Sequence, residues 1–555
     1  MAAAGTAGAA GPRRAPVQLP AGPPWPELQA TPTMGYNGWL AATMGHEPDA
    51  KNQSLYYRIA DELVASGLAA AGYDTLLTTC IGWQRDPVTR QLEAPAATWP
   101  DGFKALVDYA HARGLKVGAY TDTGAVGCCR IGTPPAREIG SLGHEELDIA
   151  RFAEWGVDHV AVDNCGHPNG TQASVYEYAA IHAALLKVGR PMVYGIWNIG
   201  AGGEWKWARK LGHYYRTSTD IGNIWGQDTA NSTTDGAQSG HMGVMFNYDV
   251  QQSIPSIAAL SGPGSFAFMD QLMVGQAPGV PHGAGDVGLS ADETRTHFGL
   301  WAIMASPLWL TYDIFDKAAA NYAAVLALVT NAEAIAINQD ARGEMAVRVD
   351  GDSRSVAGLL PRLPATCGAA NVWPNGEQLA RPLANGDFAV LAFNRLAAVN
   401  LTITIDFRDI GDTTVTCFAV RDVWARRDLG VVADRFEAGH VPPHGSRFLR
   451  LTPAHYTLCD GLPPAPPPPP AGCNVTAPAG FAAYAQRGYW SNHTLSGKAA
   501  GLTVASCAAS CAAAGASCRA FHVFHPCMPD GACYLYFGGL GAFVPNDSTY
   551  AFNRG

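Results

Sequence analysis

The sequence contains no run of the roughly 18–20 apolar residues that are needed to cross a bilayer, so we expect no membrane span. Basic residues are also scarce: 37 lysines and arginines face 47 aspartates and glutamates, which leaves a net charge of −10. Nucleic-acid binding depends on a positively charged surface, so this balance argues against a nucleic-acid partner. A neutral, polyhydroxylated ligand would suit such a protein.

Motifs that bind cofactors are missing as well. We find no glycine-rich phosphate loop, no nucleotide fingerprint and no strong metal-binding cluster between residues 31 and 342. His522 and His525 lie among cysteines near the C-terminus, but their spacing fits no zinc pattern, which favours disulfides there. The sequence therefore predicts neither a cofactor nor a metal.

The first 30 residues lack the apolar core of a signal peptide and are rich in Ala, Gly and Pro, so we expect them to be disordered. Two features still favour an oxidising compartment. The thirteen cysteines are locally dense, and several Asn-x-Ser/Thr acceptors predict a glycoprotein. The acceptors are Asn52, Asn169, Asn231, Asn400, Asn474, Asn492 and Asn546. We expect secretion or a lysosome-like or vacuole-like lumen, with an incorrectly assigned N-terminus explaining the missing signal.

A chain of 555 residues exceeds the roughly 250–300 residues that one core accommodates, which predicts two or three domains. Over residues 31–342, apolar runs alternate with helical stretches, which is typical of a parallel sheet covered by helices. Several runs end in a polar or acidic residue, and this favours a (β/α)₈ barrel because a barrel gathers all its strand ends around one site. The runs are Thr75–Cys80, Lys116–Asp122, His159–Asp163, Met192–Trp197, Tyr214–Asp220 and Pro307–Asp313, with helices at Leu55–Ala71, Phe103–Arg113 and Glu145–Trp155.

Residues 343–459 have a different texture, with strand-like runs separated by Gly, Asn and Asp turns, which predicts an antiparallel β-sandwich. The runs are Ser355–Leu360, Phe388–Phe393, Leu401–Phe407, Thr413–Val420 and Ser446–Leu451. A proline-rich linker follows over residues 460–472. Residues 473–555 hold six cysteines, enough to staple a small disulfide-rich module.

Two aspartates at strand ends suit the hydrolysis of a glycosidic bond. That reaction needs one carboxyl group to attack or to activate water, and another to protonate the leaving oxygen. Asp163 follows an apolar run, and Asp220 takes the same position two runs later. Aspartates at such positions also cap helices or order loops, so position alone leaves both interpretations open.

Several motifs favour the catalytic interpretation, because they occur in the order and at the spacing of one known family. They are Thr31-Pro32-Thr33-Met34-Gly35-Tyr36-Asn37-Gly38-Trp39, Ser141-Leu142-Gly143-His144-Glu145-Glu146, Asp163-Asn164-Cys165, Arg216 with Asp220, Gly262-Pro263-Gly264, and residues 331–340. On these motifs, residues 30–455 resemble the α-galactosidases and α-N-acetylgalactosaminidases of glycoside hydrolase family 27. The sandwich shares Arg421-Asp422-Val423-Trp424 with that family.

The resemblance implies a retaining mechanism in which Asp163 is the nucleophile and Asp220 is the general acid/base, with Arg216 contacting substrate. Retaining enzymes hold two carboxyl groups about 5–5.5 Å apart, which opposite strands of a narrow barrel allow. The prediction is an α-galactosidase-like enzyme that cleaves terminal α-linked galactose from oligosaccharides or glycoconjugates by double displacement.

The sequence departs from the family where the sugar is held. The family's paired aspartates for O4 and O6 of galactose are Thr78 and Thr79 here, its strand-four lysine is Ala161, and its acid near the 2-position is Ile196. A site that loses such hydrogen bonds loses discrimination steeply. Three alternatives therefore stay open: an α-galactosidase with a rebuilt sugar site, an α-glycosidase for another sugar such as glucose, and a carbohydrate-binding protein without activity.

Aromatic side chains dominate what remains, and aromatic faces stack on sugars as readily as they fill a core. The expected substrate contacts besides Arg216 are Tyr36, Trp39, Tyr120, Trp197, Asp122, Asp270, Thr78 and Thr79. For Phe266 we expect plain packing.

Cysteines follow the family only in part. The resemblance implies a disulfide between Cys128 and Cys165, for which Cys129 would compete, whereas Cys80 lacks its usual partner. Both halves of a further family disulfide are replaced, by Gly195 and Gly212.

The C-terminal module resembles a PAN/apple domain. The likeness rests on Cys507-Ala508-Ala509-Ser510-Cys511, then Cys518-Arg519-Ala520-Phe521, and a late Cys533-Tyr534-Leu535. Such modules bind protein or carbohydrate, so we expect either a ligand of this kind or a disulfide-bonded spacer.

Overall fold

The computed structural model describes residues 18–40, 52–130, 137–166, 175–226, 243–280, 287–349, 376–410 and 417–454, together with strands between residues 481 and 554. The chain divides into two compact units. The first comprises Met1–Leu289 and Ala305–Ala332, and the second comprises Ser290–Met304 and Glu333–Gly555.

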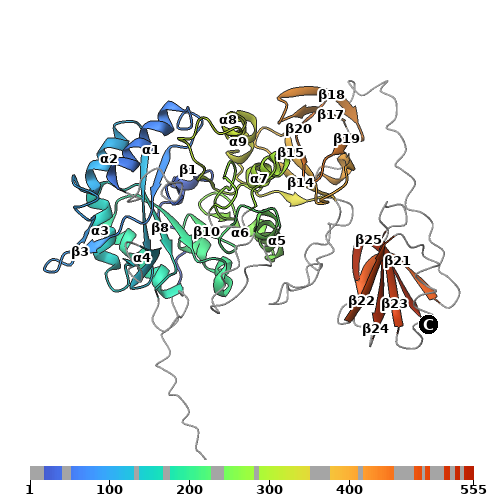
Figure 1. Cartoon of the computed structure of the whole chain (residues 1–555), viewed down its shortest axis with the longest axis horizontal. Helices are drawn as coiled ribbons and strands as arrows, with labels where there is room; N and C mark the ends of the chain where they lie inside the picture. The colour runs from blue at the N-terminus through green and yellow to red at the C-terminus, as the bar shows by residue number, and fades with distance from the viewer. Residues whose placement is uncertain are drawn as a thin grey trace, which may run out of the picture. The chain divides into compact units, whose positions relative to one another are not determined.

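The first unit is built on eight parallel strands, which hydrogen-bond in the order β11-β10-β9-β8-β5-β2-β1-β12. Figure 1 labels β1, β8 and β10 among them. Beyond β11, Leu272 forms a parallel bridge with Leu310 of β12, which brings the two ends of the sheet together. The predicted barrel is confirmed. The strands are β1 (Met34–Asn37), β2 (Thr75–Thr78), β5 (Lys116–Asp122), β8 (His159–Asp163), β9 (Val193–Trp197), β10 (Tyr214–Arg216), β11 (Phe266–Phe268) and β12 (Leu308–Leu310).

Helices connect most of these strands, as a parallel sheet requires. The first helix begins where the Asn52 side chain accepts the Leu55 N–H at 2.9 Å, so it starts two residues earlier than the sequence predicted. The helices of this unit are α1 (Gln53–Ala65), α2 (Phe103–His111), α3 (Glu145–Trp155), α4 (Val175–Val188), α5 (Val244–Ser253), α6 (Ile257–Leu260) and α8 (Tyr322–Val329). None of the helices in the described ranges is both long enough and apolar enough to cross a membrane.

Aromatic side chains fill the interior of the barrel. The Tyr214 hydroxyl lies 2.9 Å from Nε2 of His159 and accepts the indole N–H of Trp197 at 3.2 Å. Burial lowers the pKa of His159 to about 3, so its ring is neutral. A Cβ at Gly195 would lie 2.3 Å from the Tyr214 ring. Glycine at 195 is therefore explained by the tyrosine that occupies the adjacent space.

The second unit contains the antiparallel sandwich, and this predicted domain type is confirmed. Its sheets have the orders β13-β14-β15-β20-β17-β18 and β16-β19. The strands are β13 (Val347–Arg348), β14 (Gly376–Pro382), β15 (Phe388–Asn394), β16 (Leu401–Asp406), β17 (Cys417–Asp422), β18 (Arg427–Ala433), β19 (Arg435–Val441) and β20 (Ser446–Pro453). The predicted strand at Ser355–Leu360 lies outside the described residues.

Two helices belong to this second unit as well, α7 (Ala291–Ile303) and most of α9 (Ala332–Asn338). Arg421 of β17 donates two hydrogen bonds to Glu333 of α9, at 2.7 and 2.6 Å. A bidentate pair of this kind fixes both partners in direction as well as distance. Arg421 of the Arg-Asp-Val-Trp motif therefore has a structural role in joining α9 to the sandwich.

The C-terminal region forms a five-stranded antiparallel sheet in the order β21-β25-β23-β24-β22. Its strands are β21 (Phe481–Trp490), β22 (Thr494–Ala500), β23 (Cys518–Phe524), β24 (Ala532–Phe537) and β25 (Phe543–Arg554). The side chains of its cysteines lie outside the described residues. The predicted disulfides, the PAN/apple likeness and the domain boundaries stay predictions.

Replacing Gly195 by alanine tests the packing of the barrel interior. The added methyl group would overlap the Tyr214 ring, and overpacking of a core usually costs about 1–3 kcal/mol. We expect urea denaturation to show a lower free energy of unfolding by that amount. Gly22→Ala is the control, because nothing lies within 4 Å of the added methyl group. Equal stability of the two variants would mean that Tyr214 does not occupy this space.

Candidate active site

The carboxyl ends of the barrel strands bring the candidate residues to one edge of the sheet. Asp122 is the last residue of β5 and Asp163 is the last residue of β8, and the two are paired in register. Trp197, at the end of β9, pairs with Asp163 on its other side. Strand β10 ends at Arg216, so Asp220 lies four residues beyond the strand rather than at its tip.

Asp163 is held by one hydrogen bond to each oxygen. The Tyr120 hydroxyl donates to Oδ2 at 2.7 Å, and the Asn164 N–H donates to Oδ1 at 2.8 Å. Burial and the negative charge of Asp220 raise the pKa of Asp163 to about 6, although Arg216 opposes the shift. A carboxylate that is fixed in direction and poorly solvated is suited to nucleophilic attack.

Arg216 connects the acids of the site. Its buried guanidinium donates to Oδ1 of Asp220 at 2.6 Å and lies 3.5 Å from Oδ2 of Asp270. The Asp220 side chain is 53% exposed, whereas the Arg216 side chain is 2% exposed. The Arg216 guanidinium is thus buried, whereas the Asp220 carboxyl group that it holds is accessible to solvent and to a leaving group.

Asp270 and Asp122 are more deeply buried than a substrate contact requires. Asp270 has a positive φ of 76° and accepts the N–H of Ile221 at 2.9 Å, which ties it to the segment carrying Asp220. Asp122 accepts the N–H groups of Cys165 and Cys128, each at 3.2 Å. Burial and the nearby charge of Asp163 raise the pKa of Asp122 well above its usual range. These contacts favour a role in holding the loops, and their predicted contact with substrate stays a prediction.

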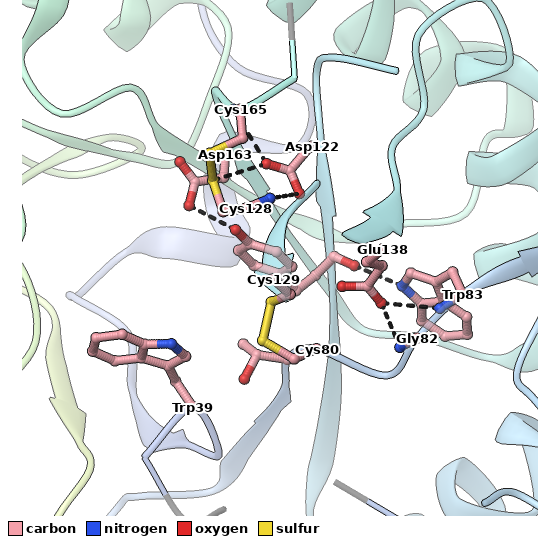
Figure 2. Close-up of a disulfide and its surroundings, with 12 residues drawn as sticks. Trp39, Cys80, Gly82, Trp83, Asp122, Cys128, Cys129, Glu138, Asp163 and Cys165 are labelled. Atoms are coloured by element: carbon pink, nitrogen blue, oxygen red, sulfur yellow. Dashed lines mark hydrogen bonds between the residues drawn. A yellow bond between two sulfur atoms is a disulfide. The ribbon is translucent and has the colours of Figure 1, made fainter. Parts of the chain in front are cut away.

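Two disulfides meet at adjacent cysteines. Cys128 pairs with Cys165, two residues beyond Asp163, and Cys129 pairs with Cys80, two residues beyond β2 (Figure 2). Cys80, which lacks its usual family partner, is thus bonded to a different cysteine, the neighbour of Cys128. Asp122, Cys128 and Cys165 converge within 4.8 Å, but both sulfurs are consumed in the disulfide and offer no thiolate to a metal.

The segment after Cys80 is fixed from a second direction. Glu138 of β7 (Arg137–Ile139) accepts the N–H groups of Gly82 and Trp83 at 2.8 and 3.1 Å, as Figure 2 shows. The Trp83 indole N–H donates to the Tyr120 carbonyl at 2.9 Å. The segment that follows β2 is therefore fixed next to Tyr120, the residue whose hydroxyl donates to Asp163.

Threonines replace the family's paired aspartates without replacing their chemistry. The Thr78 hydroxyl is buried and donates to the Gly118 carbonyl at 2.7 Å. Thr79 is buried too, with its backbone N–H and carbonyl both bonded to the Tyr56 hydroxyl at 2.9 Å. Tyr36 is fully buried and donates to the Tyr312 carbonyl. Hydrogen bonds to the backbone account for Thr78 and Tyr36, whereas the buried hydroxyl of Thr79 has no hydrogen-bond partner among the described residues. Contact of all three with substrate stays a prediction.

The aromatic residues near the strand ends form one apolar cluster with the new disulfide. Trp39, which is partly exposed, packs against a buried group that includes Tyr120, Trp197 and the Cys80–Cys129 pair. Phe266 belongs to the same cluster and is fully buried, as plain packing requires.

Three polar residues to which the sequence assigned no role of their own, Asn164, Asn198 and Glu204, complete the site. The Asn164 side chain donates to Oδ1 of Asn198 at 3.2 Å, and Asn198 hydrogen-bonds the buried carboxyl group of Glu204. Glu204 lies in a 3₁₀ turn, η3 (Ala201–Lys206), inside a glycine-rich stretch. A turn of this kind has no periodic sequence pattern. The position of Glu204 shortly after a barrel strand was the one feature of the sequence that could have pointed to it.

A parallel eight-stranded barrel that brings two carboxyl groups and an arginine to its strand ends is the arrangement of a glycoside hydrolase. The family model described as "Alpha galactosidase A" matches residues 31–340, and that of the "Alpha galactosidase C-terminal beta sandwich domain" matches residues 375–451. The chain belongs to the α-galactosidase family of glycoside hydrolases, family 27.

Individual relatives agree with this assignment. The chain is 32% identical to alpha-galactosidase A of Cellvibrio japonicus, over 77% of this chain and 93% of that protein. It is 32% identical to the alpha-galactosidase of Cyamopsis tetragonoloba, over 77% and 87% of the two chains. Among solved structures, alpha-galactosidase I of Mortierella vinacea superimposes with a TM-score of 0.63 at 26% identity, covering 77% of this chain and 98% of that one.

Peptide mapping would test the disulfide pairing. Trypsin cannot separate Cys128 from Cys129, so the pairing found here joins three peptides, 59–85, 117–130 and 152–187, in one unreduced species. Mass spectrometry of a digest prepared without reductant should detect it, and Cys80→Ala should reduce it to two peptides plus one reactive thiol. A two-peptide species in the unaltered protein would contradict the Cys80–Cys129 bond.

The raised pKa of Asp163 predicts how stability varies with pH. The folded state keeps the Asp163 proton up to about pH 6, whereas the unfolded chain releases it near pH 4, so stability falls as pH rises between these values. Asparagine cannot ionise. The Tm of Asp163→Asn relative to the unaltered protein should therefore rise by a few degrees between pH 4 and pH 7.5 in thermal denaturation. The exposed Glu93→Gln variant should show no such trend, and a constant difference for Asp163→Asn would contradict the shift.

Proposed function

We propose that this protein is a retaining glycoside hydrolase that releases terminal α-linked galactose from oligosaccharides or glycoconjugates. The observation that carries the proposal is the placement of Asp163 and Asp220 around one buried arginine. Arg216 bonds Asp220 directly, and the charges of both aspartates act on the same guanidinium. Membership of the α-galactosidase family supports the substrate class.

In the first step Asp163 attacks the anomeric carbon while Asp220 protonates the departing glycosidic oxygen. The C–O bond to the leaving group breaks as the bond to Oδ of Asp163 forms, which yields a covalent glycosyl ester. The Tyr120 hydroxyl and the Asn164 N–H hold the attacking carboxylate in direction. Because only the ionised carboxylate attacks, this step requires a pH above the pKa of Asp163, about 6.

In the second step Asp220 acts as the base. Esterification removes the charge of Asp163, so Asp220 no longer faces a neighbouring anion and holds a proton less tightly. It takes a proton from water as the oxygen attacks the anomeric carbon, and the released sugar returns the carboxylate of Asp163. Exposure of Asp220 suits this exchange with water, and Arg216 keeps it in place.

An α-glycosidase for a different sugar is the second candidate, and a specific observation favours it. Thr78 and Thr79 are buried with Thr78 bonded to the backbone, and Trp39 packs against the apolar cluster that contains Cys80 and Cys129. This side of the site is apolar where the family pattern has carboxylates. A sugar with fewer hydroxyl groups to satisfy on that side would lose less on binding.

We also propose that the protein works in an oxidising compartment, secreted or in a lysosome-like or vacuole-like lumen. Two disulfides beside the catalytic strands support this, because disulfides rarely persist in a reducing cytosol. The C-terminal module would add a glycan or protein ligand.

A panel of aryl α-glycosides tests the function. The α-galactoside, α-N-acetylgalactosaminide, α-glucoside and β-L-arabinopyranoside are offered to the unaltered protein and to Asp163→Asn, with Glu93→Gln as a surface control. Galactoside cleavage should fall by about 10³-fold or more in Asp163→Asn and persist in Glu93→Gln. Its kcat/KM should decline as pH falls below 6, because Asp163 becomes protonated.

The other outcomes separate the alternatives. If the protein cleaves only another glycoside, the proposed substrate is that sugar instead of galactose, and the proposed mechanism stands. No cleavage by a folded protein that binds glycans would overturn the enzyme and establish the binding protein. Restoration of activity in Asp163→Gly by azide, with a β-configured glycosyl azide as product, would identify the nucleophile directly.

A further inference from the structure

A fully buried acid, Glu204, lies behind the catalytic groups and has no part in the mechanism above. One of its oxygens accepts the N–H of Gly200 at 3.1 Å, and its carboxyl group also hydrogen-bonds the side chain of Asn198. Burial of a carboxyl group costs several kcal/mol unless neighbours compensate, and it raises the pKa of Glu204 well above its usual range. Such groups concentrate at functional sites.

Glu204 is connected to the nucleophile through two amides. Asn198 hydrogen-bonds Glu204, its Oδ1 accepts from the Asn164 side chain at 3.2 Å, and the backbone N–H of Asn164 donates to Asp163. Since Oδ1 of Asn198 is already an acceptor, its NH₂ group must find an acceptor of its own. Glu204 supplies one. If Asn198 flipped, its NH₂ would face the NH₂ of Asn164, so Glu204 fixes the orientation of both amides.

Glu204 also faces the arginine that carries the general acid/base. The positive charge of Arg216 is the largest favourable influence on the ionised form of Glu204, ahead of its hydrogen bonds. Arg216 already serves Asp220 and Asp270, and its buried Nε has no hydrogen-bond partner in the described part of the chain. A change at Glu204 therefore acts on both catalytic groups, through Asn198 on one side and through Arg216 on the other.

We propose that Glu204 is a positioning residue for glycoside hydrolysis, which orients the Asp163 loop through Asn198 and Asn164 from the buried side without touching substrate. The inference rests on the proposed function. Small displacements of a nucleophile have large effects on rate and small effects on ground-state binding, since an error of about 1 Å can cost 10²-fold. Loss of a positioning residue should therefore lower kcat and leave KM nearly constant.

The test uses Glu204→Gln, Asn198→Ala and the double variant of the full-length protein. They are assayed on the best aryl glycoside of the unaltered protein. We expect Glu204→Gln and Asn198→Ala each to lower kcat about 10-fold or more with KM within about twofold, by the displacement argument above. Because both act through one chain of hydrogen bonds, the double variant should lose little more than either single variant. Glu204→Asp should recover part of the activity.

Glu377→Gln is the matched control. Glu377 is also a buried acid, bonded to Arg395 at 2.7 Å in the sandwich, so its variant removes a buried charge at a residue outside the barrel sequence. It should lower Tm and leave kcat unchanged. Should Glu204→Gln fail to fold, Asn198→Ala and Glu204→Asp carry the test by the same kcat criterion.

The two proposals fail in different ways. An unaltered protein that cleaves no glycoside overturns the proposed function and Glu204 with it. An active protein whose Glu204→Gln variant keeps its kcat, or whose double variant loses the full product of the single losses, retains the function and overturns the role of Glu204.

Discussion

One buried guanidinium supports the chemistry of this site. In the described part of the chain, Arg216 lies in the field of four carboxyl groups, those of Asp163, Asp220, Asp270 and Glu204. A single positive charge cannot offset four negative ones, and burial raises the pKa of Asp163, Asp270 and Glu204, so the arrangement favours the protonated form of these acids. Double displacement needs this condition, because one carboxyl group must give up a proton while its neighbour attacks as an anion.

The backbone around the nucleophile is fixed by covalent bonds and by a buried acid rather than by the sugar-binding carboxylates of the family pattern. Cys128 and Cys129 tie one short strand to residues just beyond β8 and β2, and Asp122 holds the N–H groups on both sides of the first disulfide. Preorganisation of this kind lowers the cost of holding reacting groups in place. The strand ends therefore keep their geometry although the side chains that would grip galactose are different.

The sequence was sufficient for the barrel and the sandwich, because the order and the periodicity of their elements are written in it. Strand-end position accounts for Asp163 and Arg216, whereas Asp220 lies four residues beyond β10 and was identified by the family motif alone. The sequence was insufficient for the partner of Cys80, since a loop's path decides which of two adjacent cysteines faces it. It also missed Glu204, because a single acid in a glycine-rich turn has no periodic signal and becomes significant only through its burial. Periodic patterns predict scaffolds, whereas contacts between loops depend on tertiary packing.

The differences from the family pattern argue for a rebuilt sugar site rather than for loss of the enzyme. Where a disulfide half is missing at Gly195, Tyr214 fills the space and bonds His159 and Trp197. Where Cys80 would lack a partner, Cys129 provides one. A site released from function would accumulate cavities and unpaired thiols, because no constraint would couple one change to the next. Here the changes at Gly195 and Cys80 are compensated by Tyr214 and Cys129, the carboxylates at 78 and 79 are replaced by buried threonines, and Asp163, Asp220 and Arg216 are all in place. The residues that break the glycosidic bond are therefore retained, whereas the residues at the positions that bind the sugar differ from the family pattern.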